Sequence, residues 1–229
     1  QAISSSLTDD NFAHCERVIL DTRTSNNNAS RRIADIDYVG YNDVVWDGFT
    51  IRHGFLSDVH SAHGGGAGVS MYEGSHLRNC IVINNFSGSG RTKGAGIFCD
   101  GSTATIEGCF VLNNTATRGA VGIVSNDNQI FAGALFMYEG TCFNSLFANN
   151  FSQGSAGGLG FCVGKFYNNT IAYNTCRLEE GGVINGGAIS LATESNPNLF
   201  VANTIIYGNT GRAIRQRGQT DLNLINPFI

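Results

Sequence analysis

The fold of this chain is decided by a stretch that recurs along it, residues 68–85, which reads GVSMYEGSHLRNCIVINN. The second half of this stretch consists of a small residue, a short apolar segment and a terminal asparagine. Five segments share that pattern: residues 79–85, 108–114, 144–150, 169–174 and 203–209. Five copies of one pattern indicate an internal repeat.

The first half of the stretch recurs as well, ahead of each copy. Alternate positions of these segments stay apolar and align in two columns. One column holds Val69, Ile97, Leu135, Leu159 and Ile189, and the other holds Met71, Cys99, Met137, Phe161 and Leu191. Alternation with a period of two predicts half-buried β-strands.

The spacing of the copies predicts a solenoid. The closing asparagine recurs at intervals of 29, 36, 24 and 35 residues, at Asn85, Asn114, Asn150, Asn174 and Asn209. Because the apolar segments are constant while the spacing varies, we expect the extra residues to form loops at one corner of each coil. The long inserts run from Phe86 to Lys93, from Ala116 to Ile130 and from Cys176 to Asn185.

The tightest repeat distinguishes between two all-β architectures. Two strand types and a third short strand per coil fit within 24 residues, whereas a propeller blade needs about 40 or more. The sequence therefore predicts a parallel β-helix of about six to seven coils.

The composition agrees with this fold. With 30 glycines among 229 residues and only 14% charged residues, the chain is not a helical bundle. Asparagine at one corner can adopt a left-handed bend and hydrogen-bond the equivalent asparagine one coil away. Glycine pairs such as Gly157-Gly158 and Gly186-Gly187 are expected at the other corner.

Charge and hydropathy exclude two classes of partner. The chain has 14 basic and 18 acidic residues and no basic run longer than Arg31-Arg32, so no nucleic-acid partner is expected. No segment approaches the roughly 18 apolar residues of a membrane span. The chain begins in a polar segment, so we expect either that a signal peptide has been removed or that this is a piece of a longer protein.

The seven cysteines are interpreted as buried free thiols. Their number is odd, and Cys80 and Cys109 hold equivalent repeat positions, where they would stack as small apolar residues. An extended disulfide framework is the alternative.

The motif Gly-Gly-x-Ile, followed about fifteen residues later by a small residue, an apolar strand and Asn-Asn, resembles a known family. It is similar to the right-handed parallel β-helices of the pectate-lyase-like superfamily, in the variety seen in chlamydial polymorphic outer-membrane proteins and secreted β-helix proteins of gut Bacteroidetes. The segment Trp46-Asp47-Gly48-Phe49-Thr50-Ile51 resembles the start of their regular coils. The resemblance covers residues 43–210. It implies an exported bacterial protein, extracellular or at the cell surface.

The chain ends are less regular than its middle. Residues 1–42 are expected to form irregular N-terminal coils of the same solenoid, and residues 43–229 the regular β-helix. Because an open β-helix end exposes unpaired strand edges, we expect the chain to be a fragment of a longer protein.

One candidate site is a column of carboxylates. Glu73, Asp100 and Glu139 each precede the glycine that ends the same strand in three successive coils. Neighbouring coils lie about 4.8 Å apart, so stacked carboxylates repel unless they share a cation or a proton. Ca²⁺ is the one cofactor that this column suggests. The alternative is that the side chains diverge into water.

Two further candidates involve histidines and aromatic residues. His60 and His63 have loose metal-ligand spacing in a glycine-rich loop, but an ordinary loop is the favoured interpretation, because such a loop does not guarantee that the ligands converge. Tyr72 and Tyr138 share an outward strand position two coils apart, and Trp46 enters the first coil. Such rings bind sugars in many proteins. The alternative is that these tyrosines occur here only because tyrosine has a high β-strand propensity.

Three functions follow as expectations. The first is a non-enzymatic surface domain for adhesion or binding of a polysaccharide or cell-surface glycan. The second, which the resemblance allows, is a lyase or hydrolase acting on an acidic polysaccharide. Its candidate bases are Lys165, Lys93 and Arg91, but no lyase signature matches these residues one by one. The third is a structural spacer.

Overall fold

The computed structural model describes residues 19–21, 32–36, 43–56, 65–88, 93–117, 132–154, 156–160, 164–177, 186–191, 199–215, 222–225 and 228. The regular elements in these ranges are β-strands, arranged in four sheets with parallel pairing. None of the described residues belongs to a helix long and apolar enough to cross a membrane.

We number the sheets in the order in which one coil visits them. Sheet 1 contains β2 (Ala34–Ile36), β6 (Val69–Tyr72), β10 (Ile97–Asp100), β14 (Leu135–Met137), β18 (Leu159–Gly160), β22 (Gly186–Ser190) and β25 (Arg212–Arg215). Sheet 2 contains β3 (Val44–Asp47), β7 (Ser75–Arg78), β11 (Thr105–Glu107), β15 (Thr141–Phe143), β19 (Gly164–Tyr167), β23 (Leu199–Ala202) and β26 (Leu222–Ile225).

The other two sheets complete the coil. Sheet 3 contains β1 (Ile19–Asp21), β4 (Thr50–Arg52), β8 (Ile81–Ile83), β12 (Phe110–Leu112), β16 (Leu146–Ala148), β20 (Thr170–Ala172) and β24 (Ile205–Tyr207). Sheet 4 contains the two-residue strands β5 (Phe55–Leu56), β9 (Phe86–Ser87), β13 (Thr115–Ala116), β17 (Phe151–Ser152) and β21 (Thr175–Cys176).

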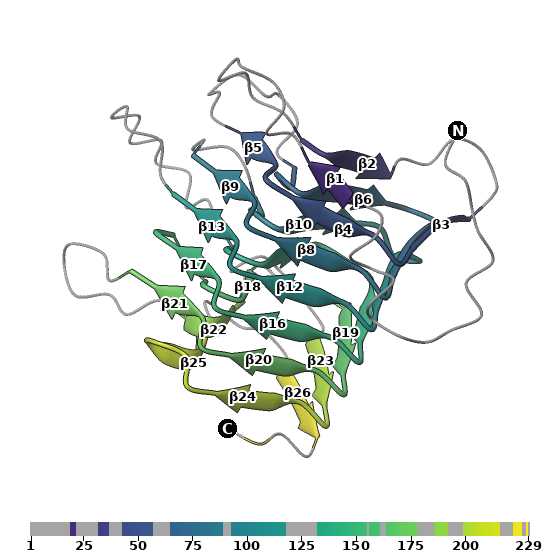
Figure 1. Ribbon diagram of the computed structural model, residues 1–229. Coiled ribbons are helices and arrows are strands. Elements are labelled where there is room, and N and C mark those ends of the chain that lie inside the picture. Colours follow the sequence, from purple (N-terminus) through teal and green to yellow (C-terminus); the bar gives the residue numbers. More distant parts are fainter. Residues whose placement is uncertain are drawn as a thin grey trace.

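The chain is a parallel β-helix, as the repeat predicts. The coil that starts with β6 continues through β7 and β8 to β9, and the next coil starts with β10 beside β6. Figure 1 shows the strands of each sheet stacked as rungs from the N-terminal to the C-terminal end. The described strands of residues 1–42, β1 and β2, are the first rungs of sheets 3 and 1.

Each coil has four strands, which corrects the expected three. The additional strands are those of sheet 2, such as β7, whose burial pattern contains only two buried residues, Ser75 and Leu77. With a single buried apolar residue per strand, no alternation is visible in the sequence.

The predicted core columns are confirmed for the described residues, and Phe161 lies outside these. Val69 pairs with Ile97, which pairs with Leu135, then Leu159 and Ile189. Met71, Cys99 and Met137 align in the neighbouring column. All of them are buried, together with Leu77, Ile106 and Phe166 of sheet 2 and Val82, Val111, Phe147 and Ile171 of sheet 3. One continuous core therefore fills the inside of the coil stack.

The left-handed bend and the hydrogen bond between coils were expected of one asparagine, but two consecutive asparagines share these roles. Asn84, Asn113 and Asn149 have φ between 53° and 56° and are exposed. The residue that follows each is buried, and its amide donates to the amide oxygen one coil further on. This ladder links Asn85, Asn114, Asn150, Asn174 and Asn209 at 2.9–3.0 Å.

The predicted inserts follow one corner of the coil. Each begins with a strand of sheet 4, namely β9, β13 or β21, and connects that sheet to sheet 1. A second long connection joins β22 of sheet 1 to β23 of sheet 2.

Candidate functional site

Four aromatic side chains, Tyr72, Phe98, Phe136 and Tyr138, form a cluster on the outer face of sheet 1. Phe98 and Phe136 hold paired positions on β10 and β14, and their rings stack with centroids 6.0 Å apart. Tyr138 meets both rings edge-on at 6.1 and 5.1 Å, and Tyr72 meets Phe98 at 6.0 Å. The phenylalanines are buried and the tyrosines half-buried. The cluster is a small apolar core outside the sheet.

Lys93 lies over this aromatic cluster. Its Nζ is 4.3 Å from the ring centroid of Tyr138 and 5.5 and 5.6 Å from those of Phe98 and Phe136. The ammonium also donates a hydrogen bond to the Tyr138 hydroxyl. A cation in this position interacts with the negative ring faces. Lys93, a candidate base, therefore contacts aromatic rings, and one face of Tyr138, a candidate sugar platform, is covered.

The three carboxylates expected to stack do not share a column. The register pairs Asp100 with Tyr72, one residue before Glu73, and the Tyr138 amide donates to the carbonyl of Cys99. Tyr72 and Tyr138 therefore align with Asp100, and Glu73 and Glu139 each lie one residue after the aligned position. The register is set by the buried residues Met71, Cys99 and Met137 rather than by the glycines that end the strands, which is why the glycine alignment was misleading.

Glu73 has a structural role in its corner. Its carboxylate accepts hydrogen bonds from the Ser102 amide at 2.6 Å, from the Ser102 hydroxyl at 3.0 Å and from the Thr103 amide at 3.2 Å. Side-chain hydrogen bonding by Thr103, followed by that of Ser102, lowers the pKa of the Glu73 carboxyl. Glu73 thus holds the turn of the next coil.

Of the remaining candidates, Lys165 is described and the others are not. Lys165 is exposed on sheet 2, where it pairs with Thr141 and Phe200. Its amide donates to the carbonyl of Gly140, the residue after Glu139, so it lies one coil beyond Glu139. Arg91, His60 and His63 lie outside the described residues. Among the residues that the structure describes, no three His, Cys, Asp or Glu side chains come together as metal ligands do.

Two exposed rings that the repeat pattern did not single out, Tyr173 and Tyr207, lie together, and we call them the tyrosine pair. Each side chain is 56% exposed, and the rings meet edge-to-face with centroids 5.6 Å apart. They lie at the corner between sheets 3 and 4, Tyr207 at the end of β24 and Tyr173 directly after β20. They are the most exposed tyrosines among the described residues.

Small neighbours make room for both rings. Tyr207 pairs with Ala172 of the preceding coil. Tyr173 lies beside Gly208, where a Cβ would approach the Tyr173 ring to 2.6 Å. Tyr173 also has φ of 56°, a conformation that is unusual for a bulky residue. The sequence does carry a signal here, because a tyrosine stands where three earlier coils have asparagine.

A column of small polar residues lines the corner between sheets 2 and 3. It contains Cys80, Cys109, Ser145, Asn169 and Thr204, all buried. The described cysteines Cys80, Cys99, Cys109, Cys142 and Cys176 are free thiols, as predicted, and Cys80 and Cys109 stack in adjacent coils. Burial raises the pKa of the Cys99 thiol to about 12.

The comparisons with known proteins give this chain no relative. No protein-family model matches it, and neither a curated protein nor a solved structure shows significant similarity to it.

Proposed function

We propose that the chain is a glycan-binding domain of an exported bacterial protein, displayed outside the cell or at its surface. The observation that carries the proposal is the tyrosine pair, two rings more than half exposed on a rigid corner of the coil stack. The likeness of the repeat to β-helices of the pectate-lyase-like superfamily, and to those of chlamydial and Bacteroidetes surface proteins, supports this setting.

The chemistry of the tyrosine pair suits a sugar. A pyranose presents C–H groups that pack on an aromatic face, and its hydroxyls need polar partners at the rim. Asn149 is exposed one coil before Tyr173. Thr175 and Thr210 follow Tyr173 and Tyr207 in the same two coils, and their hydroxyls lie 3.5 Å apart. The pair thus combines ring surface with amide and hydroxyl groups.

The backbone holds this surface in place. The Tyr173 amide donates to the Tyr207 carbonyl at 3.1 Å, and the next residue, Asn174, belongs to the buried asparagine ladder. Preorganised rings lose little conformational entropy when a ligand binds.

Glycan arrays, run with and without Ca²⁺, would identify the ligand, and titration calorimetry would give its affinity. We expect Tyr173→Ala and Tyr207→Ala each to weaken binding about tenfold or more, as loss of one aromatic contact of about 1.4 kcal/mol predicts. Tyr167→Ala is the matched control, because Tyr167 stacks on Phe143 of sheet 2, away from the pair. Unchanged affinity in both tyrosine variants would refute the proposal.

Catalysis is tested separately. Cleavage of an acidic polysaccharide, measured as new absorbance from unsaturated ends, would favour a lyase over a binding domain. If that activity were lost in Lys165→Ala or Glu139→Ala, the site would lie beside sheet 2 instead of at the tyrosine pair.

A further inference from the structure

Two thiols face each other inside the corner between sheets 2 and 3. Asn79 and Gly108 have φ of 49° and 60°, and each is followed by a cysteine whose side chain turns into the core. Cys80 and Cys109 are both completely buried. The later coils have Ser145, Asn169 and Thr204 at this position. Among the described coils, thiols therefore stack at this corner only between Cys80 and Cys109.

The backbone places the two cysteines at disulfide-forming distance. They immediately precede Ile81 and Phe110, which are paired in β8 and β12, and the Phe110 amide donates to the Cys80 carbonyl at 2.9 Å. Neighbouring strands lie about 4.8 Å apart, and disulfides join Cα atoms about 4.4–6.8 Å apart. The equivalent orientation of both side chains brings the two sulfur atoms into one column.

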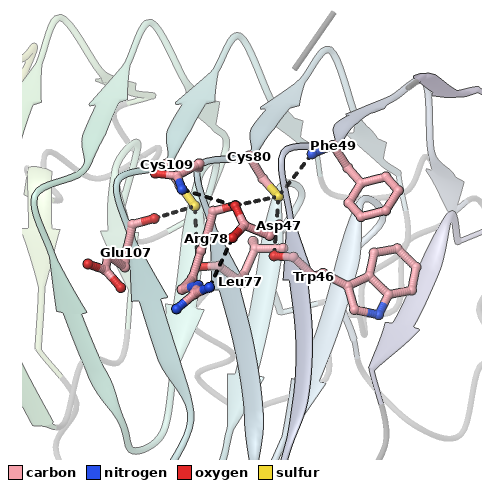
Figure 2. Close-up of polar contacts among 9 residues, drawn as sticks. Trp46, Asp47, Phe49, Leu77, Arg78, Cys80, Glu107 and Cys109 are labelled. Atoms are coloured by element: carbon pink, nitrogen blue, oxygen red, sulfur yellow. Dashed lines mark hydrogen bonds and ion pairs between the residues drawn. The ribbon is translucent and has the colours of Figure 1, made fainter. Parts of the chain in front are cut away.

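The surroundings differentiate the two thiols (Figure 2). Cys80 Sγ accepts a hydrogen bond from the Phe49 amide at 3.4 Å. The Cys109 side chain, together with this amide, lowers the pKa of Cys80. Burial raises the pKa of Cys109. Both thiols donate to backbone carbonyls, Cys109 to those of Glu107 and Leu77 and Cys80 to those of Arg78 and Trp46. The sulfur of Cys80 accepts a backbone N–H hydrogen bond, and such a bond favours the thiolate form of this thiol.

The Cys80 sulfur lies against the backbone of the preceding coil. The backbone of Trp46 and Phe49 contacts its sulfur, and both side chains are only partly buried. Their ring centroids are 5.4 Å apart, and Trp46 belongs to β3, the first strand of sheet 2. These two partly buried rings belong to the residues whose backbone contacts the Cys80 sulfur.

We propose that Cys80 and Cys109 are an oxidation site at which hydrogen peroxide produces a disulfide between two adjacent coils. The Cys80 thiolate attacks one peroxide oxygen, the O–O bond breaks, and hydroxide leaves as Cys80 becomes a sulfenic acid. The Cys109 sulfur then attacks the Cys80 sulfur and the S–O bond breaks. The Cys109 proton leaves with the hydroxyl as water, and the released hydroxide regains the proton that Cys80 lost. Two thiols and one peroxide thus give one disulfide and two waters.

The disulfide would connect two coils across 29 residues of chain. A cross-link of this kind restricts the unfolded chain, so the oxidised protein should have a higher Tm than the reduced protein. Reduction with dithiothreitol should reverse the change.

The test uses the full chain in its folded state. The protein is treated with hydrogen peroxide, its remaining thiols are alkylated in denaturant, and its peptides are mapped by mass spectrometry. We expect a peptide pair joined through Cys80 and Cys109 that disappears after reduction. Near-UV circular dichroism during oxidation confirms that the protein remains folded.

Three variants control the result. Cys109→Ser should abolish the joined peptides and leave a Cys80 sulfenic acid that dimedone labels, and serine fits because Ser145 holds the same column. Cys80→Ser should abolish both products. Cys142→Ser, which removes a thiol that is equally buried between Ile106 and Phe166, should not affect the joined peptides. Failure to form the link in folded protein, or links that join other cysteines instead, would overturn the proposal.

Discussion

At the corner between sheets 3 and 4, two consecutive positions of the repeat differ in which side chains they accept. The first accepts Asn149, Tyr173 or Gly208 in successive coils, because its side chain points into solvent and only the left-handed backbone is required. The second is asparagine in five coils, because its amide is buried and must both donate and accept. Function can therefore vary at the first position without loss of the fold.

The asparagine ladder should contribute strongly to stability. Asn114 accepts from the Asn85 amide at 3.0 Å and donates to the Val82 carbonyl at 3.0 Å. Asn114→Ala leaves these buried groups without partners, so we expect the free energy of unfolding to fall by about 2–4 kcal/mol. Urea denaturation would measure it. Asn113→Gly is the control, expected within about 0.5 kcal/mol of wild type; equal losses in both variants would contradict the division of roles.

Tyr173 should be required for binding but not for folding. Tyr173→Asn restores the residue of the earlier coils, and the relief of backbone strain, about 1–2 kcal/mol, offsets the lost ring contact of about 0.5–1.5 kcal/mol. We expect Tm to change by only a few degrees while glycan affinity falls about tenfold or more. Calorimetric unfolding and binding titration, performed on the same preparation, would separate the two effects. A marked loss of stability would show instead that the ring is structural.

At the scale of the element, strands could be predicted from the sequence only where apolar residues recur at every second position. Sheets 1 and 3 bury residues in a regular pattern that the sequence displays, such as Val69 and Met71. Strands of sheet 2 such as β7 bury a single apolar residue, here Leu77. The strands of sheet 4 have two residues each, too few to show a period. The register of Asp100 against Tyr72 also depends on the packing of Cys99 in the core.

The corner after β6 should be sensitive to acid. Because hydrogen bonds lower the pKa of Glu73 in the folded state, its ionised form stabilises the turn at neutral pH. That contribution is present above the ordinary pKa of 4.5 and is lost as the pH falls through the folded value. An NMR titration should give Glu73 a pKa below 4.5, and Thr103→Val should move it upward. An ordinary pKa in the wild type would refute this role of the carboxylate.

At the scale of the whole molecule, tolerance to insertion should follow the stacking of the coils. Four added Gly/Ser residues between Val124 and Ser125 extend a connection from sheet 4 to sheet 1, whose length already varies among repeats. We expect a change in Tm of only a few degrees. One alanine added between Asn113 and Asn114 shifts the ladder out of register and should lower Tm strongly or prevent folding. Thermal unfolding followed by circular dichroism measures both; similar effects would contradict a register-locked stack.

By itself the sequence determined the fold class, the core columns and the corner asparagines, because those properties repeat and each copy confirms the others. Only the tertiary structure decided which side chains meet between coils. It showed that Lys93 covers Tyr138, that Asp100 pairs with Tyr72, and that Tyr173 and Tyr207 stand exposed together. The physical reason is that these contacts join residues 28 to 45 positions apart. The register that aligns them is set by core packing, which no local pattern encodes.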